Sequence, residues 1–368
     1  MTVVKKVLGT YLIWLIFINL FSYYALNRFN LSVDTSYSWI NPKEFYQDKS
    51  LNLIDLRVHW DSFWYIKIVN EGYQYIPGEL SSIAFFPLYP STIWVLSQIP
   101  MLSPALGGWI VSTVALGLAL IFLYNLVKEF HPQIDPIQPI ILLLIFPTAI
   151  FLNSVYTESL FLALSIISFY YMFKKKFLKA ALFISLASIC RINGLFLLTP
   201  FLYEYFKTYG IKKFFNQDVL SLPLSFIGIL GLMVYQYVKF NEPVAFLKAQ
   251  MQWGRTFSFN SEHLHLISPS SYANLATDLL FFIVCIVSGI LMMKKIRFSY
   301  GLYVLVATLV ATSTGTLMSI SRFSLILFPI FIFIASIKSK EFQFGWQLVS
   351  ILLLAVYTTF FVNNYWAG

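Results

Sequence analysis

The residues best suited to do chemistry lie in one stretch of the chain, between His59 and Pro90. It holds the carboxylates Asp61 and Glu71 and ends in a proline-punctuated run that begins at Ala84. Around the carboxylates stand aromatic side chains, namely Trp60, Trp64, Tyr65, Tyr73 and Tyr75. A carboxylate can take a proton from a hydroxyl group, and it does so best when held beside the substrate. Carboxylates among aromatic rings therefore predict a site for a polar substrate.

Other charged residues stand out because their surroundings are apolar: Glu158, Arg191 and Arg322. A charge at membrane depth is costly and is by default a candidate for function. Guanidinium groups also hold phosphate through paired, charge-assisted hydrogen bonds. For Glu158 and Arg191 two interpretations stay open, a substrate site or an ion pair that only fixes the helices.

The elements that must position these residues are membrane helices. Of the 368 residues, 58% are hydrophobic and 11% are charged, whereas soluble domains are about 25% charged. The mean hydropathy is +0.74. Several apolar runs reach the roughly 20 residues that a spanning helix needs, and they do not alternate as barrel strands do. The sequence thus predicts an all-α polytopic membrane protein.

Charge and cysteine usage exclude other classes. The formal net charge is +9, but Lys and Arg gather in the loops predicted to be cytoplasmic, so we expect no nucleic-acid partner. Cys190 and Cys285 both fall in apolar segments, so neither a disulfide nor a metal site is predicted. His263 and His265 form the only closely spaced histidine pair, without a supporting cysteine or acidic cluster.

Apolar runs and the distribution of positive charge together predict about eleven spans, with the N-terminus inside and the C-terminus outside. The chain would form one integral membrane domain, residues 1–368. Its predicted parts are a first helix at 7–26, a first external loop with interfacial helices at 27–105, helices 2–7 at 106–239, a second external loop at 240–272, and helices 8–11 at 273–364.

Some segments carry more specific expectations. Ile54 to Val69 is predicted to be one amphipathic segment on the membrane surface. Ser91 to Met101 is too short to span and is interpreted as interfacial or re-entrant. Phe177 to Phe206 is predicted to form two short helices that meet near Arg191, since this keeps Lys207 inside. Single spans are expected at Pro139 to Leu152 and Arg322 to Ile337.

This arrangement collects most of the unusual charges on the external side: Asp55, Arg57, His59, Asp61, Glu71, Glu158, Arg191, Arg255 and Arg322. Recessed arginines beside an acidic, aromatic site suit a lipid-linked phosphosugar. The arginines would hold its phosphate and stabilise it as leaving group. A carboxylate would take the proton of a hydroxyl that attacks the anomeric carbon, through an oxocarbenium-like transition state.

Six short motifs are similar to those of the GPI mannosyltransferase II (PIG-V-like) family of polytopic glycosyltransferases. They are His59-Trp60-Asp61, Glu71-Gly72-Tyr73, the run Ala84 to Pro90, Tyr156 to Phe161, Arg191 to Gly194, and Arg322-Phe323. The most specific part combines Trp60-Asp61, Gly72-Tyr73 and the run Ala84 to Pro90. The resemblance extends from about Asn52 to Phe328. It implies a GT-C-like bundle, large external loops after the first and seventh helices, and a polyprenyl- or dolichyl-phosphate sugar donor used on the non-cytoplasmic face.

The resemblance also implies roles for single residues. Asp61 is the expected catalytic base, with Asp55 as the runner-up, and Arg191 and Arg322 are expected to bind the donor phosphate. The substrate-binding candidates are His59, Trp60, Tyr65, Glu71, Tyr73, Phe86, Glu158, Asn193, Trp253 and Arg255.

Many GT-C enzymes carry an acidic pair in the first external loop, but Asp61 is followed by Ser62 and Phe63. A divalent metal is therefore not supported by an Asp-x-Asp motif, and no cofactor is predicted.

The expected partners are a polyprenyl-phosphate-sugar lipid, a glycan, glycolipid or protein acceptor, and membrane lipids. The expected location is the plasma membrane of a prokaryote or the endoplasmic reticulum membrane of a eukaryote. Two alternatives remain open. One is a transporter or lipid flippase, in which charged residues near the membrane midplane and inverted repeats would be expected. The other is a non-catalytic subunit of a glycosylation complex.

Overall fold

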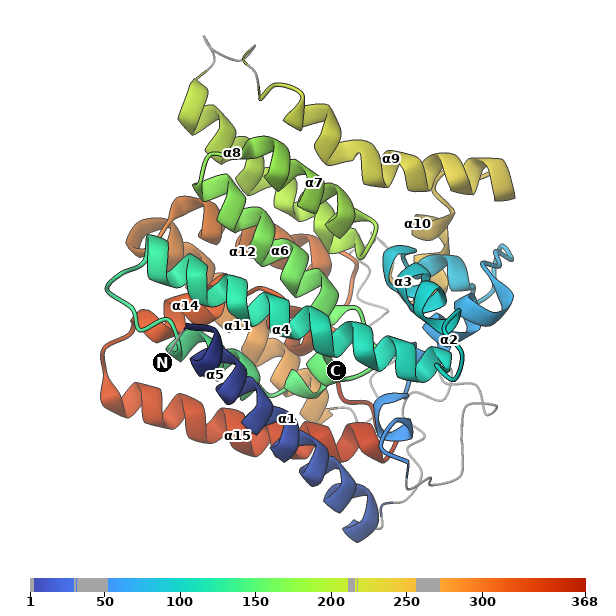
Figure 1. Ribbon diagram of the computed structural model, residues 1–368, viewed down its shortest axis with the longest axis horizontal. Coiled ribbons are helices and arrows are strands. Elements are labelled where there is room, and N and C mark those ends of the chain that lie inside the picture. The colour runs from blue at the N-terminus through green and yellow to red at the C-terminus, as the bar shows by residue number, and fades with distance from the viewer. Residues whose placement is uncertain (1–2, 30, 32–51, 211–215, 217, 256–271) are drawn as a thin grey trace.

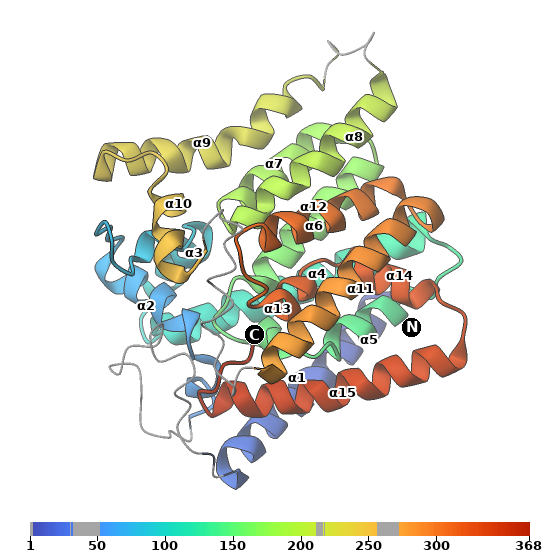
Figure 2. The same ribbon diagram turned by 180° about the vertical axis from the view of Figure 1, so that it is seen from behind.

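The structure is a computed structural model that describes residues 3–29, 31, 52–210, 216, 218–255 and 272–368. Every regular element within these ranges is an α-helix or a short 3-10 helix. The long helices run back and forth between two ends of one bundle (Figures 1 and 2). The predicted all-α class is confirmed.

Five of the described helices are long and apolar enough to cross a membrane. A helix of 20 residues rises about 30 Å, which matches the hydrocarbon core of a bilayer. The five are α1 (Val3–Arg28), α4 (Pro104–Phe130), α9 (Ser221–Phe240), α11 (Tyr272–Lys295) and α15 (Lys340–Val362). The chain is thus a multi-pass membrane protein, and the number of eleven spans stays a prediction.

Shorter helices fill the interior of the bundle: α6 (Glu158–Phe173), α7 (Phe177–Ser188), α8 (Leu198–Tyr209) and α12 (Phe298–Thr312). Helix α6 packs between α4 and α7, and α12 packs against α11. Phe169 of α6 is fully buried and contacts Tyr300 and Phe328. An apolar helix surrounded by protein needs less length than one that meets lipid along both faces.

The predicted pair of short helices near Arg191 is confirmed. Helix α7 ends at Ser188, and the chain returns through the 3-10 helix η5 (Ile192–Leu197) into α8. A Cβ atom at Gly194 would lie 2.3 Å from backbone atoms of Ala187. Glycine therefore allows the returning chain to touch α7.

Two predicted single spans are wrong in their detail. Pro139 to Leu152 forms α5 (Gln138–Leu144) and the 3-10 helix η4 (Ala149–Asn153), and Arg322 to Ile337 divides into α13 (Ile320–Leu325) and α14 (Pro329–Ser336). A proline, Pro147 or Pro329, lies at each break, where it cannot donate the hydrogen bond that would continue the helix.

The segment from Ile54 to Val69 is also not one helix. It forms the 3-10 helix η2 (Asp55–Arg57) and α2 (Asp61–Glu71), separated by a turn. The short helices η3 (Ser82–Ala84), α3 (Leu88–Ser97), α10 (Ala245–Gln250) and η7 (Met251–Trp253) complete the described segments. Helices α2, α3 and α10 gather at the right-hand end of the bundle in Figure 1.

Candidate active site

A cavity of about 470 Å³ opens at the end of the bundle where α2 and α10 lie. Its wall is formed by the start of α2, η5, the α10–η7 segment, the end of α12, and α13. Eight of the residues predicted from the sequence line it: Asp61, Tyr65, Phe86, Arg191, Asn193, Trp253, Arg255 and Arg322. They come from segments far apart in the chain, so the fold brings together most of the predicted site.

Asp61 is the first residue of α2 and follows an unusual turn at Trp60, which has φ 54° and ψ −117°. Positive φ in a bulky residue is unfavourable by about 1–3 kcal/mol and persists only where surrounding contacts fix it. The Tyr156 hydroxyl donates to the carbonyl of His59 at 3.0 Å and accepts the backbone N–H of Asp61 at 3.2 Å. These bonds span the turn and fix the start of α2, where the Asp61 side chain meets the cavity.

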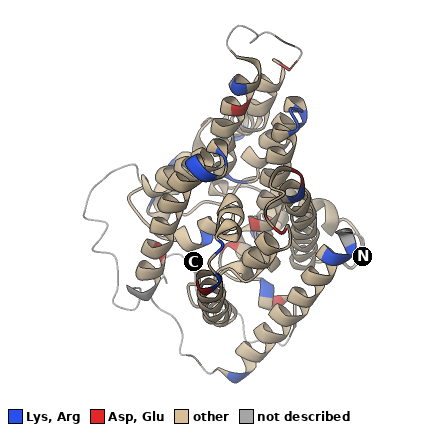
Figure 3. Ribbon diagram, turned by 90° about the vertical axis from the view of Figure 1, so that its left-hand side faces the viewer, with Lys and Arg blue, Asp and Glu red and all other residues tan. Residues whose placement is uncertain are grey.

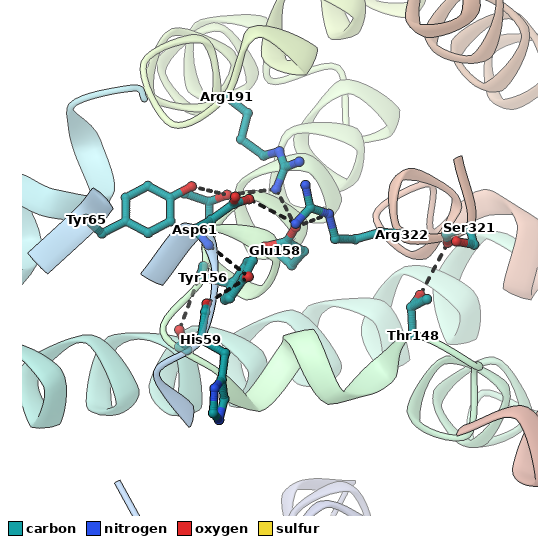
Figure 4. A network of polar contacts seen from close by, with 11 residues as sticks. His59, Asp61, Tyr65, Thr148, Tyr156, Glu158, Arg191, Ser321 and Arg322 are labelled. Carbon is teal, nitrogen blue, oxygen red and sulfur yellow. Dashed lines mark hydrogen bonds and ion pairs between the residues drawn. The ribbon is translucent and has the colours of Figure 1, made fainter. Parts of the chain in front are cut away.

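Arg322 of α13 bridges two carboxylates. Its Nη1 lies 2.9 Å from Oδ2 of Asp61, and its Nε lies 3.7 Å from Oε1 of Glu158. In Figure 4 the Arg191 side chain reaches this acidic pair from above and the Arg322 side chain from the right. A polar network of this kind holds its members in fixed geometry only because each charge has a partner.

Glu158 is fully buried at the start of α6, outside the cavity lining. Its Oε1 accepts a hydrogen bond of 2.6 Å from Nη1 of Arg191, which also donates to Oγ1 of Thr157 at 2.8 Å. The predicted ion pair between Glu158 and Arg191 is therefore present. Since Arg191 also lines the cavity, the two interpretations of this pair are compatible.

Arg255 differs from the other two arginines because no carboxylate of the described residues pairs with it. Its guanidinium lies 5.0 Å from the ring centre of Phe323, and its Nη2 donates to the carbonyl of Met318 at 3.4 Å. Burial, together with the nearby charges of Arg322 and Arg191, lowers the pKa of Arg255 to about 10. Arg255 thus stays protonated at neutral pH and adds an unpaired positive charge to the cavity.

The remaining predicted residues of the first loop lie outside the cavity lining. The Nδ1–H of His59 donates to Oδ1 of Asn364 at 2.6 Å, and burial lowers the pKa of His59 to about 4. Trp60 packs edge-on against Trp366. Glu71 is exposed, 4.0 Å from Lys67. The structure thus places His59, Trp60 and Glu71 outside the cavity lining, and their predicted part in substrate binding stays a prediction.

Tyr73 and Asp55 are also outside the lining. Tyr73 packs against Tyr235 of α9, and Asp55 begins η2, before the turn that leads to Asp61. Of the two candidate bases, the structure places only Asp61 in the cavity.

Two residues of the site region were missed. Asp278 of α11 is buried and accepts the backbone N–H groups of Ser319 at 3.1 Å and Ser321 at 2.9 Å, directly before Arg322. An acidic residue within an apolar run was a signal that could have identified it. Trp366 lines the cavity through a tertiary contact with Trp60, for which the sequence has no local signal.

The described residues contain no group of three or more His, Cys, Asp or Glu side chains that could hold a metal ion. Both acidic side chains of the network, Asp61 and Glu158, face arginines. His263 and His265 lie outside the described residues.

Fold and site together define a class: a polytopic helical membrane protein with an acidic and arginine-rich cavity at one end of the bundle. A family model described as Mannosyltransferase (PIG-V) matches residues 1–240, which is well over half of the 368 residues. The chain belongs to this family and is a membrane mannosyltransferase by that membership. No curated protein matches the chain significantly. The matched region contains Asp61, Glu158 and Arg191, whereas Arg255 and Arg322 lie beyond it.

Proposed function

We propose that the protein transfers mannose from a polyprenyl phosphate to a hydroxyl group of a glycan, glycolipid or protein acceptor, with inversion at the anomeric carbon. The observation that supports this most directly is the Asp61 carboxylate at the wall of a cavity that three guanidinium groups also line. Asp61 is the proposed base, and the arginines are the proposed phosphate ligands.

The charge of the cluster favours a donor with one phosphate. Three arginines, Arg191, Arg255 and Arg322, stand with two carboxylates, Asp61 and Glu158. These five groups carry about one net positive charge when all are ionised, and the buried carboxyl of Asp278 near Arg255 and Arg322 lowers that sum further when it is ionised. A phosphodiester between a polyprenol and a sugar carries one negative charge and would balance it, whereas a diphosphate would leave negative charge uncompensated in a partly buried site.

The uncharged lining supports the same donor. Apolar side chains of η5, α12 and α13 form one side of the cavity and suit an isoprenoid chain: Ile192, Phe196, Val310, Ala311 and Phe323. On another side stand the aromatic rings of Phe85 and Trp253, 5.5 Å apart. The buried indole N–H of Trp253 has no hydrogen-bond partner among the described residues and is available to a sugar hydroxyl.

The reaction follows from these positions. The acceptor hydroxyl forms a bond to the anomeric carbon and gives its proton to Asp61. The bond between that carbon and the phosphate oxygen breaks, and the electron pair leaves with the polyprenyl phosphate, whose charge the arginines stabilise. Without donor, Arg322 is paired with Asp61. A phosphate that takes Arg322 would release the Asp61 oxygen to act as base.

The proposed orientation places the cavity on the non-cytoplasmic side. The opposite end of the bundle, which faces the viewer in Figure 3, shows more Lys and Arg than Asp and Glu. Positive charge near the ends of membrane helices favours the cytoplasmic side. The proposal also includes that the protein has a GT-C fold. Its proposed location is the plasma membrane or the endoplasmic reticulum membrane.

The test is a transfer assay with purified protein in nanodiscs. Radiolabelled polyprenyl-phosphate-mannose is offered with a lipid and glycan extract, with and without EDTA, and nucleotide-diphosphate mannose is the comparison donor. We expect label in a new product from the polyprenyl donor only, and loss of transfer with EDTA would add a metal to the proposal. Movement of donor across the bilayer without product would favour a flippase. Absence of both, with donor still bound, would favour a non-catalytic subunit.

A further inference from the structure

A second polar cavity, of about 530 Å³, lies at the end of the bundle remote from the candidate active site. It is lined by the end of α4, by α8, by the last residues of α11 and by the start of α12. Helix α12 separates the two sites, because Phe298 at its start lines this cleft and Val310 near its end lines the other cavity. At 1.5 Å per residue they are roughly 20 Å apart along the helix. We call this second cavity the basic cleft.

Four cationic side chains line the basic cleft: Lys207 of α8, Lys294 and Lys295 of α11, and Arg297. Only Arg297 has an acidic partner among the described residues. Its Nε and Nη2 each lie 3.0 Å from an oxygen of Glu204, whose Oε1 also accepts a bond from Ser299. Glu204 is thus fully engaged, and the three lysines have no carboxylate within ion-pair distance in the described part of the chain.

Backbone groups add to this positive potential. Helix α12 begins directly after Arg297, and the Arg297 side chain does not cap it. The first N–H groups of a helix lack partners inside the helix, and together with the helix dipole they attract anions. The residue that starts the helix, Phe298, lines the cleft. The uncapped helix start and the three lysines therefore meet in one cavity.

Two simpler explanations account for only part of this arrangement. Lys294 and Lys295 at the end of α11 interact favourably with its dipole, and basic residues in general collect at cytoplasmic helix ends. The second explanation also places Lys207 at this end of the bundle, but neither requires the three lysines and the start of α12 to line one cavity. The three lysines are exposed, so water and salt screen their mutual repulsion, and an anion bound between them would lower it further.

We propose that the basic cleft binds the phosphate of an anionic membrane phospholipid. The lysines and the N–H groups of α12 would hold the headgroup. Apolar side chains of the same cleft, Phe130, Ile296 and Phe298, would contact the glycerol and the first methylene groups. Basic pockets between membrane helices are typical binding sites for such headgroups. His131 also lines the cleft, and burial lowers its pKa to about 4, so this side chain is neutral and adds no charge.

The proposal is tested by native mass spectrometry of the full chain in detergent, titrated with phosphatidylglycerol or phosphatidylcholine. The cleft variant carries Lys207→Gln, Lys294→Gln and Lys295→Gln. The matched control carries Lys5→Gln, Lys338→Gln and Lys340→Gln, which removes the same charge from exposed positions outside the cleft. We expect wild type and control to retain one phosphatidylglycerol, and the cleft variant to bind it about 100-fold more weakly, since three lysine contacts are lost and each contributes about a factor of five to binding an anionic headgroup.

A competition experiment with inorganic phosphate distinguishes a site for a lipid headgroup from a site for a soluble anion. Inorganic phosphate in excess should not displace phosphatidylglycerol, because it lacks the apolar contacts. Equal retention of phosphatidylglycerol by the cleft and control variants would overturn the site. Complete displacement by inorganic phosphate, or equal binding of phosphatidylcholine, would overturn the assignment to an anionic lipid. Circular dichroism of each variant shows whether its helices are intact. If the triple variant does not fold, Lys295→Gln alone against Lys338→Gln gives the same comparison.

Discussion

At the scale of single residues, Asp61 pairs with Arg322 in the structure, and its proposed role is to accept the proton of the acceptor hydroxyl during transfer. We predict that Asp61→Asn reduces kcat about 10²–10⁴-fold, because the proton acceptor is lost. Donor affinity should equal or exceed that of wild type, because the variant also lacks the carboxylate that pairs with Arg322. The matched control is Glu79→Gln, an exposed residue of the same region. If the Asp61→Asn variant transferred mannose as fast as the Glu79→Gln variant, another group would have to be the base.

Arg255 is the residue whose charge has no acidic partner among the described residues. We predict that Arg255→Gln weakens binding of polyprenyl-phosphate-mannose about 10- to 100-fold, because one charge-assisted hydrogen bond contributes roughly 1.5–3 kcal/mol. Lys239→Gln removes an equal charge from the exposed end of α9 and should have no effect. The measurement is a donor-binding titration. An unchanged dissociation constant would mean that Arg191 and Arg322 bind the phosphate without Arg255.

At the scale of elements, the turn before α2 determines where Asp61 points. We predict that Tyr156→Phe lowers the free energy of unfolding by about 1–3 kcal/mol, since the N–H of Asp61 loses its partner and the carbonyl of His59 keeps only the N–H of Ser62. Transfer should fall more than donor affinity, because Asp61 rather than the arginines is displaced. Thermal unfolding and single-turnover rates measure the two effects.

The matched control for that turn is Tyr73→Phe. The Tyr73 hydroxyl is buried without a hydrogen-bond partner among the described residues, and it lies outside the cavity lining. Tyr73→Phe should therefore leave both stability and transfer within error of wild type. An equal loss of kcat in the two variants would show that the Tyr156 hydroxyl does not position Asp61.

At the scale of the whole molecule, the two ends of the bundle should face opposite sides of the membrane. We predict that Glu79→Cys reacts with a membrane-impermeant thiol reagent from the non-cytoplasmic side, and that Lys338→Cys reacts only after permeabilisation. Glu79 is a better position than Gly78, whose φ of +87° disfavours a side chain. The native Cys190 and Cys285 are buried. The reverse labelling pattern would invert the topology and move the proposed site to the cytoplasm.

The sequence by itself determined that the chain is a helical membrane protein, and it identified the residues whose side chains could take part in catalysis or binding. Apolar runs of spanning length dictate helices, because only helices and closed barrels satisfy every backbone group in lipid. The charged residues of apolar segments could be identified for a related reason. A charge in apolar surroundings costs free energy and is found there only when it is paired or has a function, which singles out Asp61, Glu158, Arg191 and Arg322. The reversal of the chain near Arg191 could be predicted because the positive-inside rule places Lys207 on the cytoplasmic side.

Tertiary structure alone decided which charges pair and which stay unpaired. Asp61 and Arg322 are 261 positions apart in the chain, and no local signal shows that the two side chains meet. The turn at Trp60 depends on Tyr156 and Trp366, and Arg322 depends on Asp278 of a different helix. Such contacts arise from packing between distant segments, whereas hydrophobic pattern and proline position report only on nearby residues. For this reason the sequence showed the components of the site, and the fold showed that Arg255 has no carboxylate partner among the described residues.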